Sequence, residues 1–185
     1  MKIIIIDHFD SYTNNLKKLI SDNVQVEIIN NVDLNLNALN FNEIDGFVLS
    51  PGPGRSDNVN DFRNSRELIE TCKTMSKPLI GICLGHQGLG TTLSNQNKLI
   101  NVRSIRHGHS VKIKTFESKL FKGVPDNFSV ITYNSLTLSI DNLENSNLKV
   151  IATENDDFNS VMGIEYKGSP LFGLQFHPEV SYLFD

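Results

Sequence analysis

The chain has 185 residues with 17 Lys or Arg and 21 Asp or Glu, a formal net charge of −4 that argues against a nucleic-acid binder. This length supports one domain with a full core, and the apolar run at residues 3–6 is too short for a signal peptide or a membrane span. Two cysteines give neither a disulfide framework nor a zinc motif, so we expect a cytoplasmic protein and find no sign of a metal or cofactor.

Apolar runs and helical stretches alternate through the first half of the chain. In chain order we predict a strand over 2–6, a helix over 11–21, strands over 24–29 and 46–49, a helix over 61–75 and a strand over 79–82. Continuous apolar strands separated by helices predict a parallel sheet covered on both faces. After about residue 97 we expect short strands joined by loops, at 111–113, 128–131, 150–152, 161–165 and 171–176. The predicted fold class is therefore α/β, with a largely parallel central sheet that is extended by added hairpins.

The run Gly81-Ile82-Cys83-Leu84-Gly85 ends a predicted buried strand, and a helix is expected to follow. This is the layout of a nucleophile elbow, a strand-turn-helix unit that exposes a reactive side chain at the end of a sheet. Glycines allow the tight turn and close approach of other groups. A thiol at a helix N-terminus is favoured as thiolate, the form that attacks carbonyl carbons. Cys83 is therefore the candidate nucleophile.

A cysteine nucleophile needs a base, and the base needs an orienting group. His177 and Glu179 fit these roles, because residues two apart in an extended segment project to the same side. Pro178 between them favours an extended geometry. By itself a His-Pro-Glu tripeptide is typical of a surface loop, but together with the elbow it indicates a catalytic pair.

A further element, Ser50-Pro51-Gly52-Pro53-Gly54, follows the predicted strand over 46–49 directly. By itself it indicates a rigid turn. Its place at the carboxyl end of a strand, where α/β folds build their sites, favours a functional role. Backbone amides from this loop and the amide that follows the nucleophile could together form an oxyanion hole.

Five motifs together resemble the class I, triad-type glutamine amidotransferases: DHFDSYTNNL at 7–16, SPGPG at 50–54, GICLGHQ at 81–87, YNSL at 133–136 and GLQFHPE at 173–179. The first two narrow the resemblance to the small glutaminase subunit of anthranilate synthase or of aminodeoxychorismate synthase. The resemblance implies one domain over residues 1–185 with three α/β/α layers, the flavodoxin-like fold of this family. A helix that covers the sheet normally follows the last motif, so the sequence is interpreted as truncated after Asp185.

The resemblance also implies roles for individual residues. Cys83 would attack the side-chain amide of glutamine, His177 would transfer protons, and Glu179 would orient His177. The amides of Gly54 and Leu84 would hold the oxyanion. Glutamine would be recognised by Gly52, Pro53, Gly54, Gln87, Ser135 and Leu136. Ammonia would then pass to a larger, chorismate-binding synthase subunit in a heteromeric complex.

Four positions depart from the usual pattern of the family: Asn134 replaces a His, Val180 a Ser and His109 a Lys, and Arg55-Ser56 lacks a common proline. None belongs to the proposed triad. Two alternatives stay open: another triad amidotransferase or γ-glutamyl hydrolase, and a non-catalytic regulatory subunit of the same fold. A papain-like protease is disfavoured, because its cysteine opens a helix near the mature N-terminus and its third partner is usually Asn.

Other reactive side chains have simpler interpretations. Cys72 is expected to be half-buried on the predicted helix over 61–75, and His86 to serve packing or capping rather than catalysis. His107 and His109 lack a third ligand for a metal, so we interpret their segment as a loop at the partner interface.

Overall fold

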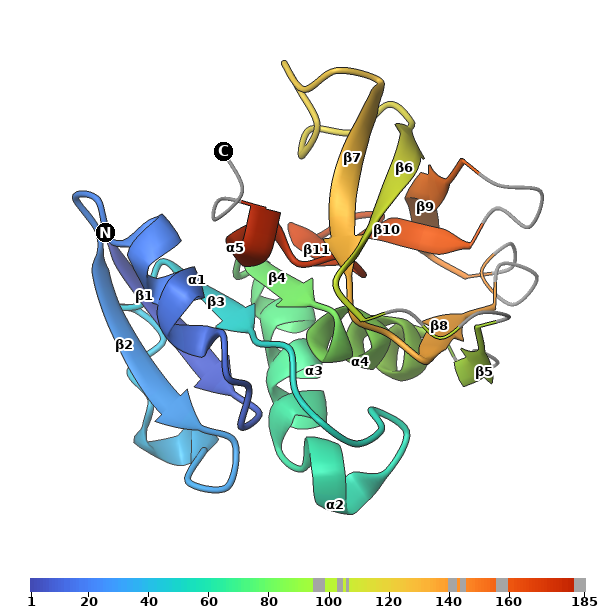
Figure 1. Cartoon of the computed structure of the whole chain (residues 1–185). Coiled ribbons are helices and arrows are strands. Elements are labelled where there is room, and N and C mark those ends of the chain that lie inside the picture. The colour runs from blue at the N-terminus through green and yellow to red at the C-terminus, as the bar shows by residue number, and fades with distance from the viewer. Residues whose placement is uncertain are drawn as a thin grey trace.

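The computed structural model describes residues 1–94, 99–102, 105, 107–139, 143, 146–155 and 160–181 (Figure 1). Its helical elements are α1 (Thr13–Ile20), the 3₁₀ turn η1 (Leu36–Ala38), α2 (Val59–Phe62), α3 (Ser65–Met75), α4 (Leu84–Leu93) and α5 (Pro178–Ser181). Its strands are β1 (Lys2–Asp7), β2 (Gln25–Asn30), β3 (Gly46–Leu49), β4 (Leu79–Ile82), β5 (Leu99–Asn101), β6 (His109–Thr115), β7 (Asn127–Thr132), β8 (Leu136–Leu138), β9 (Leu148–Glu154), β10 (Val161–Tyr166) and β11 (Leu171–Leu174).

The main sheet has nine strands in the order β2-β1-β3-β4-β11-β10-β9-β6-β7. The strands from β2 to β11 run parallel, in pairs such as Leu49 with Gly81 and Leu174 with Ile82. The strands from β11 to β7 pair antiparallel. The chain returns from the antiparallel half to place β11 beside β4, so the last strand lies in the middle of the sheet (Figure 1).

Helices cover both faces of the parallel half. Ile4 and Ile6 of β1 belong to one apolar cluster with side chains of α3 and α4, whereas Ile5 belongs to a second cluster with Leu16 of α1. This division follows from the alternation of side chains along a strand. The short helix α5 contacts α1 and lies on the same side of the sheet (Figure 1). The predicted three-layer α/β/α fold, with a parallel central sheet and added antiparallel strands, is therefore confirmed.

The fold brings the ends of four parallel strands to one edge of the sheet. The segments after β1, β3, β4 and β11 begin with His8, Ser50, Cys83 and Gln175, respectively. Backbone hydrogen bonds join these ends: Ser50 N donates to Ile6 O at 3.0 Å, and Cys83 N donates to Leu174 O at 2.8 Å. The carboxyl edge is the usual place for a site in a doubly wound sheet.

Two sequence predictions need correction. The helix predicted over 61–75 is two helices, α2 and α3, because Arg63 between them has a φ of 47°. The strand predicted over 171–176 ends at Leu174. The pattern also gave no sign of the antiparallel pair β5 and β8, whose strands are only three residues long. Among the described residues, no helix has the length and apolar character needed to cross a bilayer.

Candidate active site

Cys83 occupies the predicted turn between β4 and α4. Its φ of 50° and ψ of −98° are unusual for a residue with a side chain. A non-glycine residue held in this conformation has a strained backbone, which is typical of functional sites. The two flanking glycines make this turn possible. A Cβ on Gly81 would lie 2.4 Å from the carbonyl oxygen of Gly85, and a Cβ on Gly85 would lie 2.5 Å from that of Leu49. The strand-turn-helix arrangement predicted from the sequence is therefore confirmed.

His177 and Glu179 lie three and five residues after β11, at the same edge of the sheet. The Nδ1 of His177 donates to Oε1 of Glu179 at 2.6 Å, and both side chains are almost fully buried. The backbone N–H of His177 donates to the carbonyl of Ile131 in β7 at 3.0 Å, which ties this segment to the antiparallel half.

The expectation of an extended segment over residues 177–179 is wrong. Pro178 is the first residue of α5, and Glu179 lies in the first turn of that helix. A proline fits this position because the first helical residue needs no hydrogen-bonded N–H and its fixed φ suits a helix. The helical turn, rather than a pleated strand, therefore brings the carboxylate back to the imidazole.

The electrostatic environment favours a protonated His177. Burial alone would lower its pKa, but hydrogen bonds with Cys83 and Glu179, and the negative charges of both groups, outweigh burial and raise the pKa to about 10. An imidazolium beside the sulfur favours the thiolate form of a cysteine. Cys83 and His177, distant in the sequence, therefore lie together at the carboxyl edge of the sheet.

The predicted oxyanion loop, Gly52-Pro53-Gly54, follows β3 at the same edge. Gly52 packs so closely that a Cβ would lie 2.4 Å from the carbonyl oxygen of His8. Gly54 has a φ of +89°, a conformation that favours glycine. The next backbone N–H, of Arg55, donates to Asp61 at 2.9 Å. Leu84 is the first residue of α4, where a backbone N–H has no acceptor within its own helix.

Three of the predicted glutamine-binding residues lie outside the loop at 52–54: Gln87, Ser135 and Leu136. Gln87 lies one turn after Cys83 on α4, and its Nε2 donates to the carbonyl of Leu136 at 2.9 Å. The structure thus brings Gln87 and Leu136 together. Ser135 is exposed, and its carbonyl accepts a hydrogen bond from Val102 N at 2.9 Å. Asn134, which departs from the family pattern, also donates to Leu136 O, at 3.0 Å.

Sequence reasoning assigned no role to Gln175, which contacts the sulfur of Cys83. Its Nε2 donates to Cys83 Sγ at 3.6 Å, and its Oε1 accepts from Gln87 Nε2 at 3.2 Å. The available signal was one polar residue inside the apolar run Gly173-Leu174-Gln175-Phe176, immediately before the His-Pro-Glu motif.

Two tyrosines and Asp10, to which sequence reasoning assigned no catalytic role, interact with His177. The Tyr133 ring lies edge-on to His177 with centroids 5.2 Å apart, and Tyr12 lies 6.5 Å from His177 and 5.9 Å from Tyr133. Burial raises the pKa of Asp10, which accepts a hydrogen bond from Tyr12 N at 2.7 Å. All three lie inside the quoted motifs at 7–16 and 133–136, which is the signal that could have found them.

The other Cys and His side chains singled out from the sequence differ in their burial. Cys72 is fully buried rather than half-buried, and burial raises its pKa to about 12. His86 is fully buried against Gly173, and burial lowers its pKa to about 4. His107 and His109 are exposed. Within the described ranges, no group of three or more His, Cys, Asp or Glu side chains is placed to hold a metal ion.

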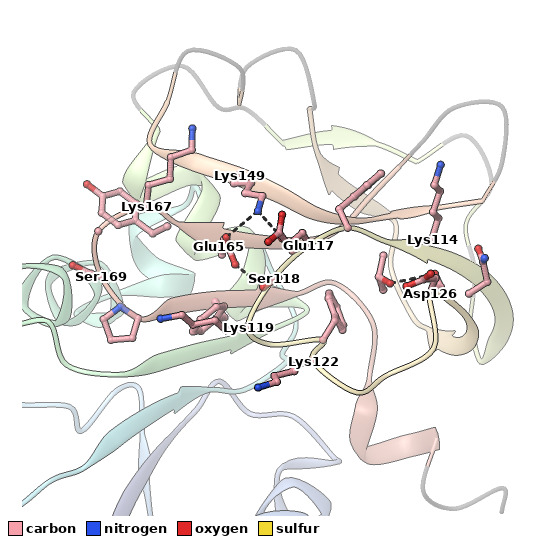
Figure 2. Close-up of a pocket in the computed structure, with 18 residues that line it drawn as sticks. Lys114, Glu117, Ser118, Lys119, Lys122, Asp126, Lys149, Glu165, Lys167 and Ser169 are labelled. Atoms are coloured by element: carbon pink, nitrogen blue, oxygen red, sulfur yellow. Dashed lines mark hydrogen bonds and ion pairs between the residues drawn. The ribbon is translucent and has the colours of Figure 1, made fainter.

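An open groove of about 1100 Å³ is lined by the end of β6, the segment after it and the turn between β10 and β11 (Figure 2). Glu165 in this groove accepts one hydrogen bond from Ser118 Oγ at 2.5 Å and pairs with Lys149 Nζ at 3.4 Å. None of the predicted site residues lines the groove. The groove and the candidate site at the strand ends are therefore separate features of the molecule.

Comparisons with known proteins agree with the resemblance. The family model described as "Glutamine amidotransferase class-I" matches residues 4–182. The chain is 34% identical to the anthranilate synthase component 2 of Pyropia yezoensis, covering 98% of this chain and 93% of that protein. It is 31% identical to the aminodeoxychorismate synthase of Streptomyces griseus, covering 97% of this chain but 24% of that protein. The crystal structure of a glutamine amidotransferase from Thermotoga maritima superimposes with a TM-score of 0.79 at 18% identity, covering 97% of this chain and 76% of that one.

Proposed function

Because the chain belongs to the class I glutamine amidotransferase family, we propose that it hydrolyses L-glutamine through a triad of Cys83, His177 and Glu179. The observation that supports this proposal most strongly is the buried pair of His177 and Glu179. Their nitrogen and oxygen are 2.6 Å apart, and His177 also pairs with Cys83 at the elbow. We further propose that residues 1–185 act as one amidotransferase domain.

In the first half-reaction, the Cys83 thiolate attacks the carbonyl carbon of the glutamine side-chain amide and forms a carbon–sulfur bond. The carbonyl oxygen becomes an oxyanion, which the backbone amides of Gly54 and Leu84 would stabilise. The carbon–nitrogen bond then breaks, and protonated His177 donates its proton to the leaving nitrogen. Ammonia leaves, and a γ-glutamyl thioester remains on Cys83.

In the second half-reaction, His177 accepts a proton from a water molecule that attacks the thioester carbon. The carbon–sulfur bond breaks, glutamate is released, and the thiolate and imidazolium are restored. Glu179 keeps Nδ1 of His177 protonated throughout, so Nε2 faces the reacting atoms. Gly52, Pro53, Gly54, Gln87, Ser135 and Leu136 are proposed to hold the glutamine.

The names of the relatives suggest where the ammonia goes. The proteins from Pyropia yezoensis and Streptomyces griseus are named for anthranilate synthase and aminodeoxychorismate synthase. We propose that this chain delivers ammonia to a larger synthase subunit that aminates chorismate, inside a heteromeric complex. A sheltered path between the two sites would keep ammonia unprotonated and nucleophilic.

The test is glutamate release from glutamine by the wild type and by Cys83→Ala, each alone and with a candidate chorismate-aminating subunit. We expect release that rises with one partner and vanishes in the variant, while that complex still forms product from added ammonia. Cys72→Ala is the matched control, because it removes the other thiol, which lies in the core. Glutamate release that persists in Cys83→Ala would overturn the proposed nucleophile.

A further inference from the structure

Gln175 is a buried polar residue at the centre of the candidate site. It follows β11 directly, its side chain is fully buried, and its backbone N–H donates to Met162 O at 3.0 Å. The neighbouring residues Leu174 and Phe176 are apolar and also buried. A buried amide is costly unless its donors and acceptor are satisfied, so the partners of Gln175 are informative.

One partner is the candidate nucleophile. The Nε2 of Gln175 lies 3.6 Å from Cys83 Sγ, a hydrogen-bonding distance for a sulfur acceptor. A neutral thiol accepts hydrogen bonds weakly, whereas hydrogen bonds to an ionised acceptor are about twice as strong as neutral ones. The contact therefore favours the thiolate over the thiol.

The other end of the Gln175 amide is held so that its N–H faces the sulfur. Gln87 Nε2 donates to Gln175 Oε1 at 3.2 Å and also to Leu136 O at 2.9 Å. If the Gln175 amide were turned over, its NH₂ would face the NH₂ of Gln87, and its oxygen would face the sulfur. The first contact would set two donors against each other, and the second would be unfavourable for a thiolate. The Leu136 carbonyl therefore orients Gln87, and Gln87 orients Gln175.

Resting on the function proposed above, we propose that Gln175 is a further catalytic residue, whose side-chain N–H stabilises the Cys83 thiolate, with Gln87 as its positioning residue. The sulfur carries negative charge before attack and regains it when the thioester collapses. The Gln175 N–H stabilises that negative charge at both stages. It also holds the sulfur in place from a second direction, in addition to the contact with His177.

The test measures the rate of Cys83 alkylation by iodoacetamide between pH 4 and pH 10, a readout that needs neither glutamine nor a partner. Gln175→Leu and Gln175→Met remove the N–H while retaining bulk. In both we expect the pH of half-maximal alkylation to rise by about one to two units. Gln175→Glu places a carboxylate against the thiolate, so its shift should be larger. Cys83→Ala is the control that reports any labelling of Cys72.

Steady-state kinetics separate this role from packing. In Gln175→Leu we expect kcat for glutamine to fall about 10- to 100-fold while KM stays within about threefold. Gln87→Leu should shift the alkylation profile in the same direction but less, because the Gln175 amide is then free to turn. Unchanged alkylation profiles in the folded Leu, Met and Glu variants would overturn the inference. Failure of the proposed function would be seen separately, as glutamate release that survives in Cys83→Ala.

Discussion

The close packing of Gly85 against β3 allows a sharp test of how the elbow is held. In Gly85→Ala, the added Cβ would lie 2.5 Å from the carbonyl oxygen of Leu49 and 2.6 Å from its Cβ. Leu49 is fully buried at the end of β3, a strand that is paired on both sides, so it has no space to withdraw. The variant therefore forces α4 away from β3 and carries the Cys83 turn with it.

The size of the effect follows from these distances. Ordinary van der Waals contact begins at 3.4 Å, so the helix start must move by about 1 Å. Overpacking of this kind lowers the free energy of unfolding by about 1–3 kcal/mol. In a chain of this size, a loss of about 2 kcal/mol lowers Tm by about 4–8 °C. A displacement of about 1 Å at a reacting group costs about 100-fold in kcat.

Thermal unfolding followed by circular dichroism and glutamate release measure the two effects on the same preparations. Gly123→Ala is the matched control: its φ is +84°, and an added Cβ meets nothing within 4 Å. It should lose about 1–2 kcal/mol from the left-handed backbone and keep its kcat. A Gly85→Ala variant with wild-type Tm and kcat would refute the packing argument.

Two further predictions concern ionisable side chains, Glu179 of the proposed triad and the buried His8. Glu179→Gln should lower kcat by about 10²- to 10⁴-fold, because the amide no longer fixes the protonated Nδ1 of His177. Burial lowers the pKa of His177, and Glu179 is one of the two groups that outweigh burial and raise this pKa to about 10. Glu179→Gln should therefore also move the alkaline limb of the pH–rate profile, where His177 loses its proton, to lower pH. An unshifted profile would argue against Glu179 as the orienting group. Burial lowers the pKa of His8 to about 4, so His8 stabilises the fold above pH 6.5 and this stabilisation is lost as the pH falls toward 4. Urea unfolding should show that the free energy of unfolding falls by about 2 kcal/mol between pH 7 and pH 5 because of this group. His8→Asn should remove this loss, and an identical pH dependence in that variant would contradict the prediction.

The parts of the site that were predicted from sequence depend on local chemistry. Gly81 and Gly85 around Cys83 define a turn within five residues, and the buried runs at 46–49 and 79–82 correspond to parallel strands in the structure. The same local reasoning placed the break after β3 at the loop 50–54.

The parts that were missed depend on long-range contacts or on short elements. Gln175 and Cys83 are 92 residues apart, so only the fold reveals that they touch. The helical turn at Pro178 was predicted as extended, because a proline suits both conformations and the contact of α5 with α1 and β7 decides between them. The positive φ of Arg63, which divides α2 from α3, has no glycine or proline to signal it.

The proposed function depends on Cys83 acting as the nucleophile of a glutaminase. The most direct measurement is mass spectrometry of the protein after incubation with a glutamine-like electrophile, with and without glutamine. We expect one covalent adduct, mapped to Cys83, slowed by glutamine and absent from Cys83→Ala. An adduct at another residue, or none while the wild type still releases glutamate, would contradict it.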